Sequence, residues 1–69
     1  MTVRQLLERK ENYSKIKIFR DGEIIFSGNI DDLYEEEREL LFMRVLDYTN
    51  DLHMVINSKW YWDCTIEVE

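Results

Sequence analysis

Six carboxylates lie within nine consecutive residues, and they form the densest group of side chains that could do chemistry in this chain. They are Asp31, Asp32, Glu35, Glu36, Glu37 and Glu39. On a helix, residues three or four apart share a face, and hard oxygen ligands of this kind suit magnesium or calcium. The run lacks the alternating Asp/Asn pattern, the glycine and the closing Glu of a calcium loop. We therefore expect an acidic surface that meets solvent or a partner, and no metal site.

The other groups with catalytic potential are single residues. His53 is the only histidine and Cys64 the only cysteine, with no spacing that would build a closed zinc site within one chain. Cys64 has no cationic neighbour in sequence to lower its pKa, so we expect a buried structural thiol. The chain has two glycines and no phosphate-binding loop. These features predict a protein that is not an enzyme and needs no cofactor.

The aromatic cluster Trp60-Tyr61-Trp62 leaves two interpretations open. In a strand, Trp62 would point inward and Tyr61 outward, with Trp60 near a turn. Aromatic side chains are enriched at the centres of interfaces and in sites that stack nucleobases, but two of these three could equally belong to the core. We take Tyr34, Trp60 and Tyr61, together with the six carboxylates, as candidate partner-binding residues.

Charge is divided unevenly along the chain. Residues 1–20 hold six bases and two acids, a balance of +4, whereas residues 21–69 hold three bases and thirteen acids, a balance of −10. Lys15, Lys17 and Arg20 with Phe19 could form a basic strand face for single-stranded nucleic acid. The acidic remainder argues against that function, and it favours a basic protein surface as partner. We expect no direct binding to nucleic acid or membrane.

Length and composition limit the architecture. The 69 residues predict one small domain spanning 1–69, whose core is small enough that a homo-oligomer is expected. A single cysteine excludes a disulfide within the chain and suits a reducing compartment, so we expect a cytoplasmic protein.

The first third predicts a helix and a hairpin. Thr2 to Gln5 match a capping box, which favours a helix at about 3–11 that docks through Val3, Leu6 and Leu7. Asp21-Gly22 predicts a tight turn between two strands. Of two registers, we favour a three-residue loop that pairs Ile18 with Ile24 and Ile16 with Phe26, because it places four apolar residues on one face.

The remaining residues predict an acidic helix and a set of strands. The helix covers 32 to about 41, and strands follow at 43–49, 52–57 and 60–68, with a turn at 50–51. The alternative is one long helix from 31 to 49, which the spacing of Leu41, Val45 and Tyr48 would also allow. The favoured order, α-β-β-α-β-β-β, predicts an α+β fold. Its antiparallel sheet would have four to five strands with two short helices packed on one face.

Several short motifs occur together along most of the chain. They are the Thr2-Val3-Arg4-Gln5-Leu6-Leu7 opening, the lysine-rich strand from Ile16 to Ile18, the Asp21-Gly22 turn, and the acidic helix that leads to Val45-Leu46. In this layout the chain resembles small uncharacterised proteins of phages and prophages of Firmicutes. Some small acidic proteins from that setting are anti-CRISPR or other anti-defence inhibitors, so the resemblance implies a non-catalytic blocker.

Two functions follow as hypotheses. The leading one is an acidic protein-binding module that mimics nucleic acid. Its carboxylates would enter a basic groove on a partner such as a nuclease or another nucleic-acid-binding protein, with aromatic anchors beside them. The alternative is a homo-oligomeric sponge that sequesters a nucleotide-like small molecule. Aromatics from two chains would then stack the base while Arg44 or Lys59 holds a phosphate.

Overall fold

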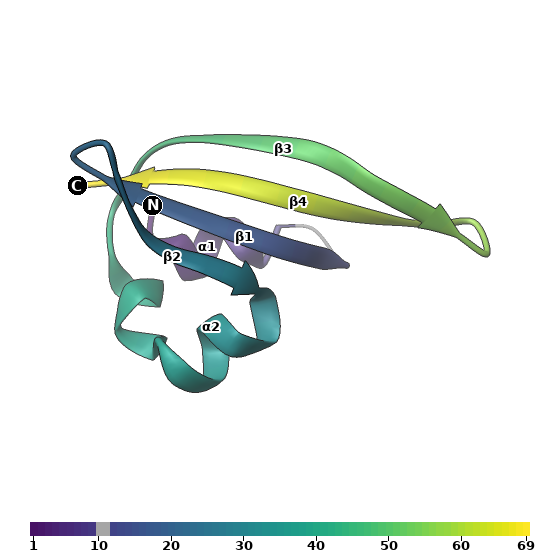
Figure 1. Cartoon of the computed structure of the whole chain (residues 1–69), viewed down its shortest axis with the longest axis horizontal. Helices are drawn as coiled ribbons and strands as arrows, with labels where there is room; N and C mark the ends of the chain where they lie inside the picture. Colours follow the sequence, from purple (N-terminus) through teal and green to yellow (C-terminus); the bar gives the residue numbers. More distant parts are fainter. Residues whose placement is uncertain (10–11) are drawn as a thin grey trace.

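A computed structural model describes residues 1–9 and 12–69, which form an α+β fold. Four strands make one sheet in the order β2-β1-β4-β3 (Figure 1). The helical elements are α1 (Val3–Leu7), α2 (Ile30–Glu36) and the 3₁₀ helix η1 (Arg38–Phe42), and the strands are β1 (Tyr13–Arg20), β2 (Glu23–Asn29), β3 (Val45–Ile56) and β4 (Lys59–Val68).

The sheet is mixed, so the expectation of an antiparallel sheet is wrong. The two hairpins, β1–β2 and β3–β4, are antiparallel, but the central pair β1 and β4 is parallel. The cause is the crossover through α2 and η1, which carries the chain from one edge of the sheet to the other. Because such a connection returns the chain to the end where β2 began, β3 runs in the direction of β2 and β4 in the direction of β1.

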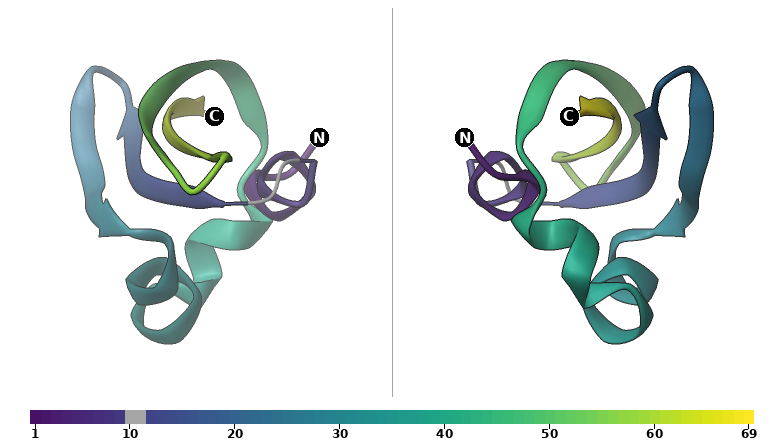
Figure 2. Two further views of the ribbon diagram at one scale, coloured as in Figure 1. Left: turned by 90° about the vertical axis from the view of Figure 1, so that its right-hand side faces the viewer. Right: turned by 90° about the vertical axis from the view of Figure 1, so that its left-hand side faces the viewer.

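One face of the sheet carries all three helical elements (Figure 2). The core lies between that face and the helices, and it consists of Val3, Leu6, Leu7, Tyr13, Ile16, Ile18, Leu33, Leu41, Cys64, Ile66 and Val68. Apolar and polar residues alternate along β4, and Cys64, Ile66 and Val68 are all buried, as this alternation predicts for a strand with one face on the core. Phe26 and Trp62 pack against the margin of this core.

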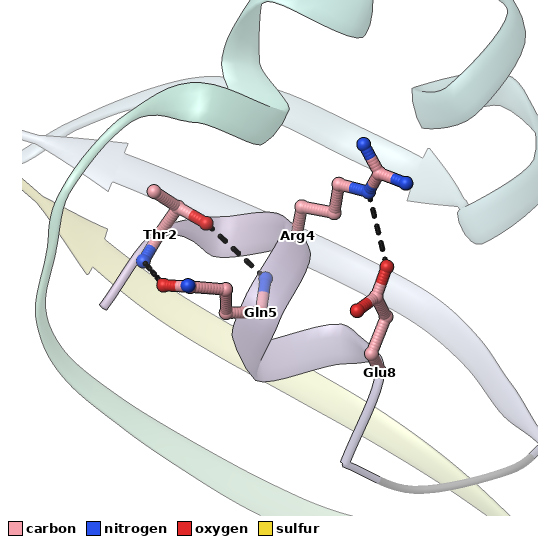
Figure 3. Close-up of polar contacts among 4 residues, drawn as sticks. All are labelled: Thr2, Arg4, Gln5 and Glu8. Carbon is pink, nitrogen blue, oxygen red and sulfur yellow. Dashed lines mark hydrogen bonds and ion pairs between the residues drawn. The ribbon is translucent and has the colours of Figure 1, made fainter.

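The predicted capping box begins α1. The hydroxyl of Thr2 accepts from the N–H of Gln5 (3.2 Å), and the side-chain oxygen of Gln5 accepts from the N–H of Thr2 (2.9 Å; Figure 3). The helix ends at Leu7, earlier than the predicted 3–11, and residues 10–11 of that prediction lie outside the described part of the chain. Backbone hydrogen bonds from Val3 to Met43 and from Val45 to Met1 then fix α1 to the start of β3.

The β1–β2 hairpin differs from the favoured register. Phe19 pairs with Ile24 across a two-residue Asp21-Gly22 loop in which both residues have positive φ. This is the backbone of the hairpin turn that Asp-Gly sequences favour. A bulge then shifts the register, so that Ile18 pairs with Phe26 and Ile16 with Gly28. The bulge turns Ile16, Ile18 and Phe26 toward the core despite the short loop, which the three-residue prediction did not anticipate.

The expected strands 43–49 and 52–57 form one continuous strand, so the turn predicted at 50–51 does not exist. Asn50 is held within β3 because its side-chain oxygen accepts from the hydroxyl of buried Tyr13 (3.1 Å). Asp51 pairs with Asp63 on β4. These tertiary contacts override the local turn preference of the Thr49-Asn50-Asp51 sequence. The turn lies instead at Asn57-Ser58, between the predicted strands 52–57 and 60–68, with φ of 50° and 64°.

The acidic helix is shorter than the predicted 32 to 41. α2 ends at Glu36, and Glu37 leaves helical geometry before η1 continues to Phe42. The alternative of a long helix from 31 to 49 is wrong, since β3 begins at Val45. Within the described residues, no helix is long and apolar enough to cross a membrane.

Replacing Leu33 with Ala tests how the acidic helix is attached. Leu33 is the one fully buried side chain of α2, so its truncation should cost about 2–5 kcal/mol of unfolding free energy. Leu46→Ala is the matched control, because Leu46 is exposed and its loss should cost less than about 0.5 kcal/mol. Urea denaturation followed by circular dichroism measures both. Equal effects of the two substitutions would contradict the packing of α2 described here.

Candidate functional site

The six predicted carboxylates lie on α2 and on the segment that joins it to η1. Five of the six are exposed, and Glu37 is half-buried. Three ion pairs occur among residues 1–9 and 12–69, Arg4–Glu8, Arg44–Glu69 and His53–Asp63, and none of them involves this segment. The pKa of Glu37 is raised, first by a hydrogen bond with the Glu39 carboxyl and then by its negative charge. The segment therefore presents crowded negative charge to solvent.

The segment is divided between two places on the surface. Asp31 and Asp32 lie in the first turn of α2, where the positive end of the helix dipole stabilises them. They line an open hollow of about 310 Å³ together with Tyr13, Ser14, Asn29, Ile30 and Tyr61. Its lining residues come mainly from the start of β1, the end of β2 and the start of α2. These three segments lie near one another at one end of the sheet (Figure 1). The structure thus brings Tyr61 to Asp31 and Asp32, although thirty residues separate them in sequence.

Tyr34 lies elsewhere. It lines a second hollow with Arg4, Arg38, Leu41 and Phe42, beside α1 and η1. Burial raises the pKa of the Tyr34 hydroxyl, and the charge of Glu8 raises it further. Tyr34 therefore packs toward the first helix and is not part of the hollow that contains Tyr61.

Trp60 and Tyr61 are on opposite faces of β4. The alternation of the strand points Trp60 and Trp62 to the side of Cys64 and turns Tyr61 away from them, toward the hollow that it shares with Asp31 and Asp32. The rings of Trp60 and Trp62 are stacked, with centroids 6.1 Å apart and an interplanar angle of 23°. The two residues that the sequence grouped as aromatic anchors consequently serve two different surfaces.

Exposed apolar residues of β3 were missed by the sequence reasoning. Leu52, Met54, Val55 and Ile56 are all exposed in the outer part of the β3–β4 hairpin. Composition could have indicated this apolar surface, because residues 52–62 contain no acidic residue, although the whole chain has 15. The erroneous turn at 50–51 concealed it, since it divided one long strand into two short ones and hid the length of the β3–β4 hairpin.

His53 makes a specific contact with Asp63. Its Nδ1 lies 2.9 Å from one carboxylate oxygen of Asp63, and the other oxygen accepts from the backbone N–H of Lys15 (3.1 Å). The β1–β4 pairing is irregular between Tyr13 and Ile16, so the Asp63 side chain satisfies a backbone donor that the ladder leaves unpaired. This geometry gives Asp63 and His53 a structural role in joining β1 to the β3–β4 hairpin.

Cys64 is buried among core residues. Burial raises the pKa of its thiol to about 11, and the negative charge of Asp51 adds to the effect. A thiol that stays protonated at neutral pH is a poor nucleophile and a poor metal ligand.

Among the described residues, no three His, Cys, Asp or Glu side chains are grouped closely enough to hold a metal ion.

The cations considered for phosphate binding are far apart within one chain. Arg44 lies just before β3, next to the Val45–Val68 pair at one end of the hairpin, and it contacts Glu69 at 3.8 Å. Lys59 pairs with Ile56 at the opposite end of the same hairpin. One molecule therefore does not bring Arg44 and Lys59 to the same phosphate group.

Comparison with known protein families, curated proteins and solved structures gives no match. The resemblance to phage and prophage proteins remains a hypothesis that rests on the short motifs quoted for it.

Replacing Asp63 with Ala should lower the unfolding free energy by about 1–3 kcal/mol, because the Lys15 N–H and His53 both lose their acceptor. Asp63→Asn keeps an acceptor oxygen and should recover most of that loss. Asp51→Ala is a control on the facing strand. Denaturant melts at neutral pH measure all three, and an Asp63→Ala protein as stable as wild type would refute the structural role.

The raised pKa of the buried Cys64 thiol predicts that the folded protein loses stability at alkaline pH. Its folded-state pKa of about 11 exceeds the ordinary value of 9.0, so the unfolded chain releases the proton first as pH rises. Stability contributed by the neutral thiol is complete below pH 9 and should fall by about 2–3 kcal/mol between pH 9 and pH 11. Cys64→Ala should show a correspondingly smaller fall over the same interval. Parallel pH profiles for the two proteins would contradict the burial of the thiol.

Proposed function

We propose that this chain is a non-catalytic protein-binding module that presents its acidic segment, residues 31–39, to a basic surface of another protein. The observation that carries the proposal is that the carboxylates of this segment make no ion pair within the described residues while five of the six face solvent. An acidic surface neutralised by its own chain would have little field left to offer. Charge of this kind acts mainly on the association rate and on the choice of partner.

The hollow beside α2 supplies the most specific contact in this proposal. It combines the carboxylates of Asp31 and Asp32 with the ring of Tyr61, next to Tyr13. Carboxylates and aromatic rings are the two groups that favour a Lys or Arg side chain, through charge-assisted hydrogen bonds and cation–π attraction. We propose that a basic side chain of the partner enters this hollow while Glu35, Glu36 and Glu39 contact the surrounding basic surface.

The class of partner follows from the form of the charge. A row of carboxylates on a short helix repels nucleic acid. A basic groove that binds phosphates would also attract these carboxylates, so the partner we propose is a nuclease or other nucleic-acid-binding protein. The resemblance to phage and prophage proteins favours an inhibitor of host defence, such as an anti-CRISPR protein, as the biological setting. Both statements are proposals that extend the acidic-surface argument.

Reversing three charges tests the proposal. The variant Glu35→Lys, Glu36→Lys, Glu37→Lys should associate roughly tenfold more slowly with a purified nuclease that has a basic nucleic-acid groove and that wild type binds. Surface plasmon resonance at low and moderate salt measures the rate, and a DNA oligonucleotide should compete with wild type for the same nuclease.

A matched variant separates local from overall charge. Glu23→Lys, Glu67→Lys, Glu69→Lys changes the net charge equally at three exposed positions outside the segment. Its association rate should fall less than about threefold. If the association rate falls by the same factor in both triple variants, or falls in neither, residues 31–39 are not the binding surface.

A further inference from the structure

We infer that the helix-bearing face of the outer β3–β4 hairpin, residues 52–62, is a self-association surface that packs against the same face of a second copy of this chain. The inference is independent of the acidic segment and of its partner. It comes from the length of the hairpin, from its exposed apolar side chains, and from the distribution of charge.

The hairpin extends beyond the rest of the fold (Figure 1). β1 pairs with β4 from Trp62 onward, so among the described strands residues 59–61 of β4 pair with β3 alone. β3 is an edge strand of the sheet, and its first residue, Val45, is also hydrogen-bonded to Met1. The helices contact the inner part of the sheet, where the core residues Cys64, Ile66 and Val68 lie. A two-stranded ribbon without a covering layer is marginally stable in water. Within residues 1–9 and 12–69, the outer hairpin therefore lacks the helical layer that covers the inner sheet.

The helix-bearing face of the outer hairpin is apolar. Leu52 pairs with Trp62 and Val55 with Trp60, and directly opposed residues share a face. These four side chains continue the core outward from Cys64 along the helix-bearing side. Trp60 is 53% exposed, Val55 51% and Leu52 47%, while Trp62 is half-buried. The opposite face is mixed, because it includes His53 and Asp63.

Charge favours a second copy as the occupant. The whole chain carries −6, so two copies that met through most of their surface would bring carboxylates together. Residues 52–62 contain one base, Lys59, and no acid, which makes this hairpin +1 and the remaining 58 residues −7. A two-fold arrangement of hairpins lets apolar side chains meet through a segment that contains no acid. An isologous contact of this kind is the commonest form of homo-oligomer.

The available area indicates a weak dimer. The three exposed side chains offer on the order of 300 Å² of apolar surface, since a large side chain buries roughly 150–250 Å² when fully covered. With polar atoms at the rim this gives about 500 Å² per copy, below the roughly 800 Å² of a standard interface. We therefore expect a reversible dimer with a dissociation constant between about 1 and 100 μM.

Sedimentation velocity of the full chain from about 1 μM to about 1 mM tests the inference, because this range brackets the expected dissociation constant. Wild type should pass from monomer to dimer. Both tryptophans of the chain lie in the hairpin, so their fluorescence should shift to shorter wavelength over the same concentrations. This second measurement needs no variant. A wild type that stays monomeric throughout, with unchanged fluorescence, overturns the proposal.

Two substitutions locate the surface. Val55→Asp keeps both tryptophans and should raise the dissociation constant at least tenfold. Ile24→Asp is the control, since Ile24 is 55% exposed on β2, away from the outer hairpin. The Ile24→Asp protein should dimerise as wild type does. Circular dichroism checks that each variant is folded, and Leu52→Ser replaces Val55→Asp if the latter is not. A folded hairpin variant that dimerises like wild type, or an Ile24→Asp protein that loses the dimer, overturns the assignment of this face.

Discussion

The structure depends on a mismatch in length between its sheet and its helical layer. α1, α2 and η1 have 5, 7 and 5 residues, whereas β3 has 12 and β4 has 10. Helical elements this short cover the inner sheet, where the buried core lies, and leave Leu52, Val55 and Trp60 of the outer hairpin exposed. In a chain of this size the core contributes only a small free energy of unfolding, so exposing an apolar ribbon to water lowers the stability appreciably. This is why we propose the outer hairpin as a self-association surface.

Sequence patterns predicted the local structure wherever one signal dominated. The capping box at Thr2, the Asp21-Gly22 turn and the alternation from Cys64 to Val68 are all local, and all three are present. The errors came from long-range contacts. The parallel pairing of β1 with β4 depends on a helical crossover that periodicity does not encode. The continuity of β3 depends on a hydrogen bond from Tyr13, 37 residues away, to Asn50.

The candidate site was predictable in composition and not in arrangement. Six clustered acids imply an exposed surface, and five of them are exposed. That Tyr61 joins Asp31 and Asp32, while Tyr34 and Trp60 turn to other surfaces, follows from strand register and helix placement. The chain consequently offers two separate surfaces of opposite character, an acidic one on α2 and an apolar one on the hairpin. A dimer through the second would present two copies of the first.

Amide hydrogen exchange at several protein concentrations tests the central idea most directly, because exchange reports local opening residue by residue. If the outer hairpin lacks its own second layer, the amides of residues 54–61 should exchange far faster than those of residues 64–68 in dilute protein. Their protection should then rise with protein concentration while that of the core stays constant. Outer amides as protected as the core in dilute protein would contradict the account, as would protection that does not change with concentration.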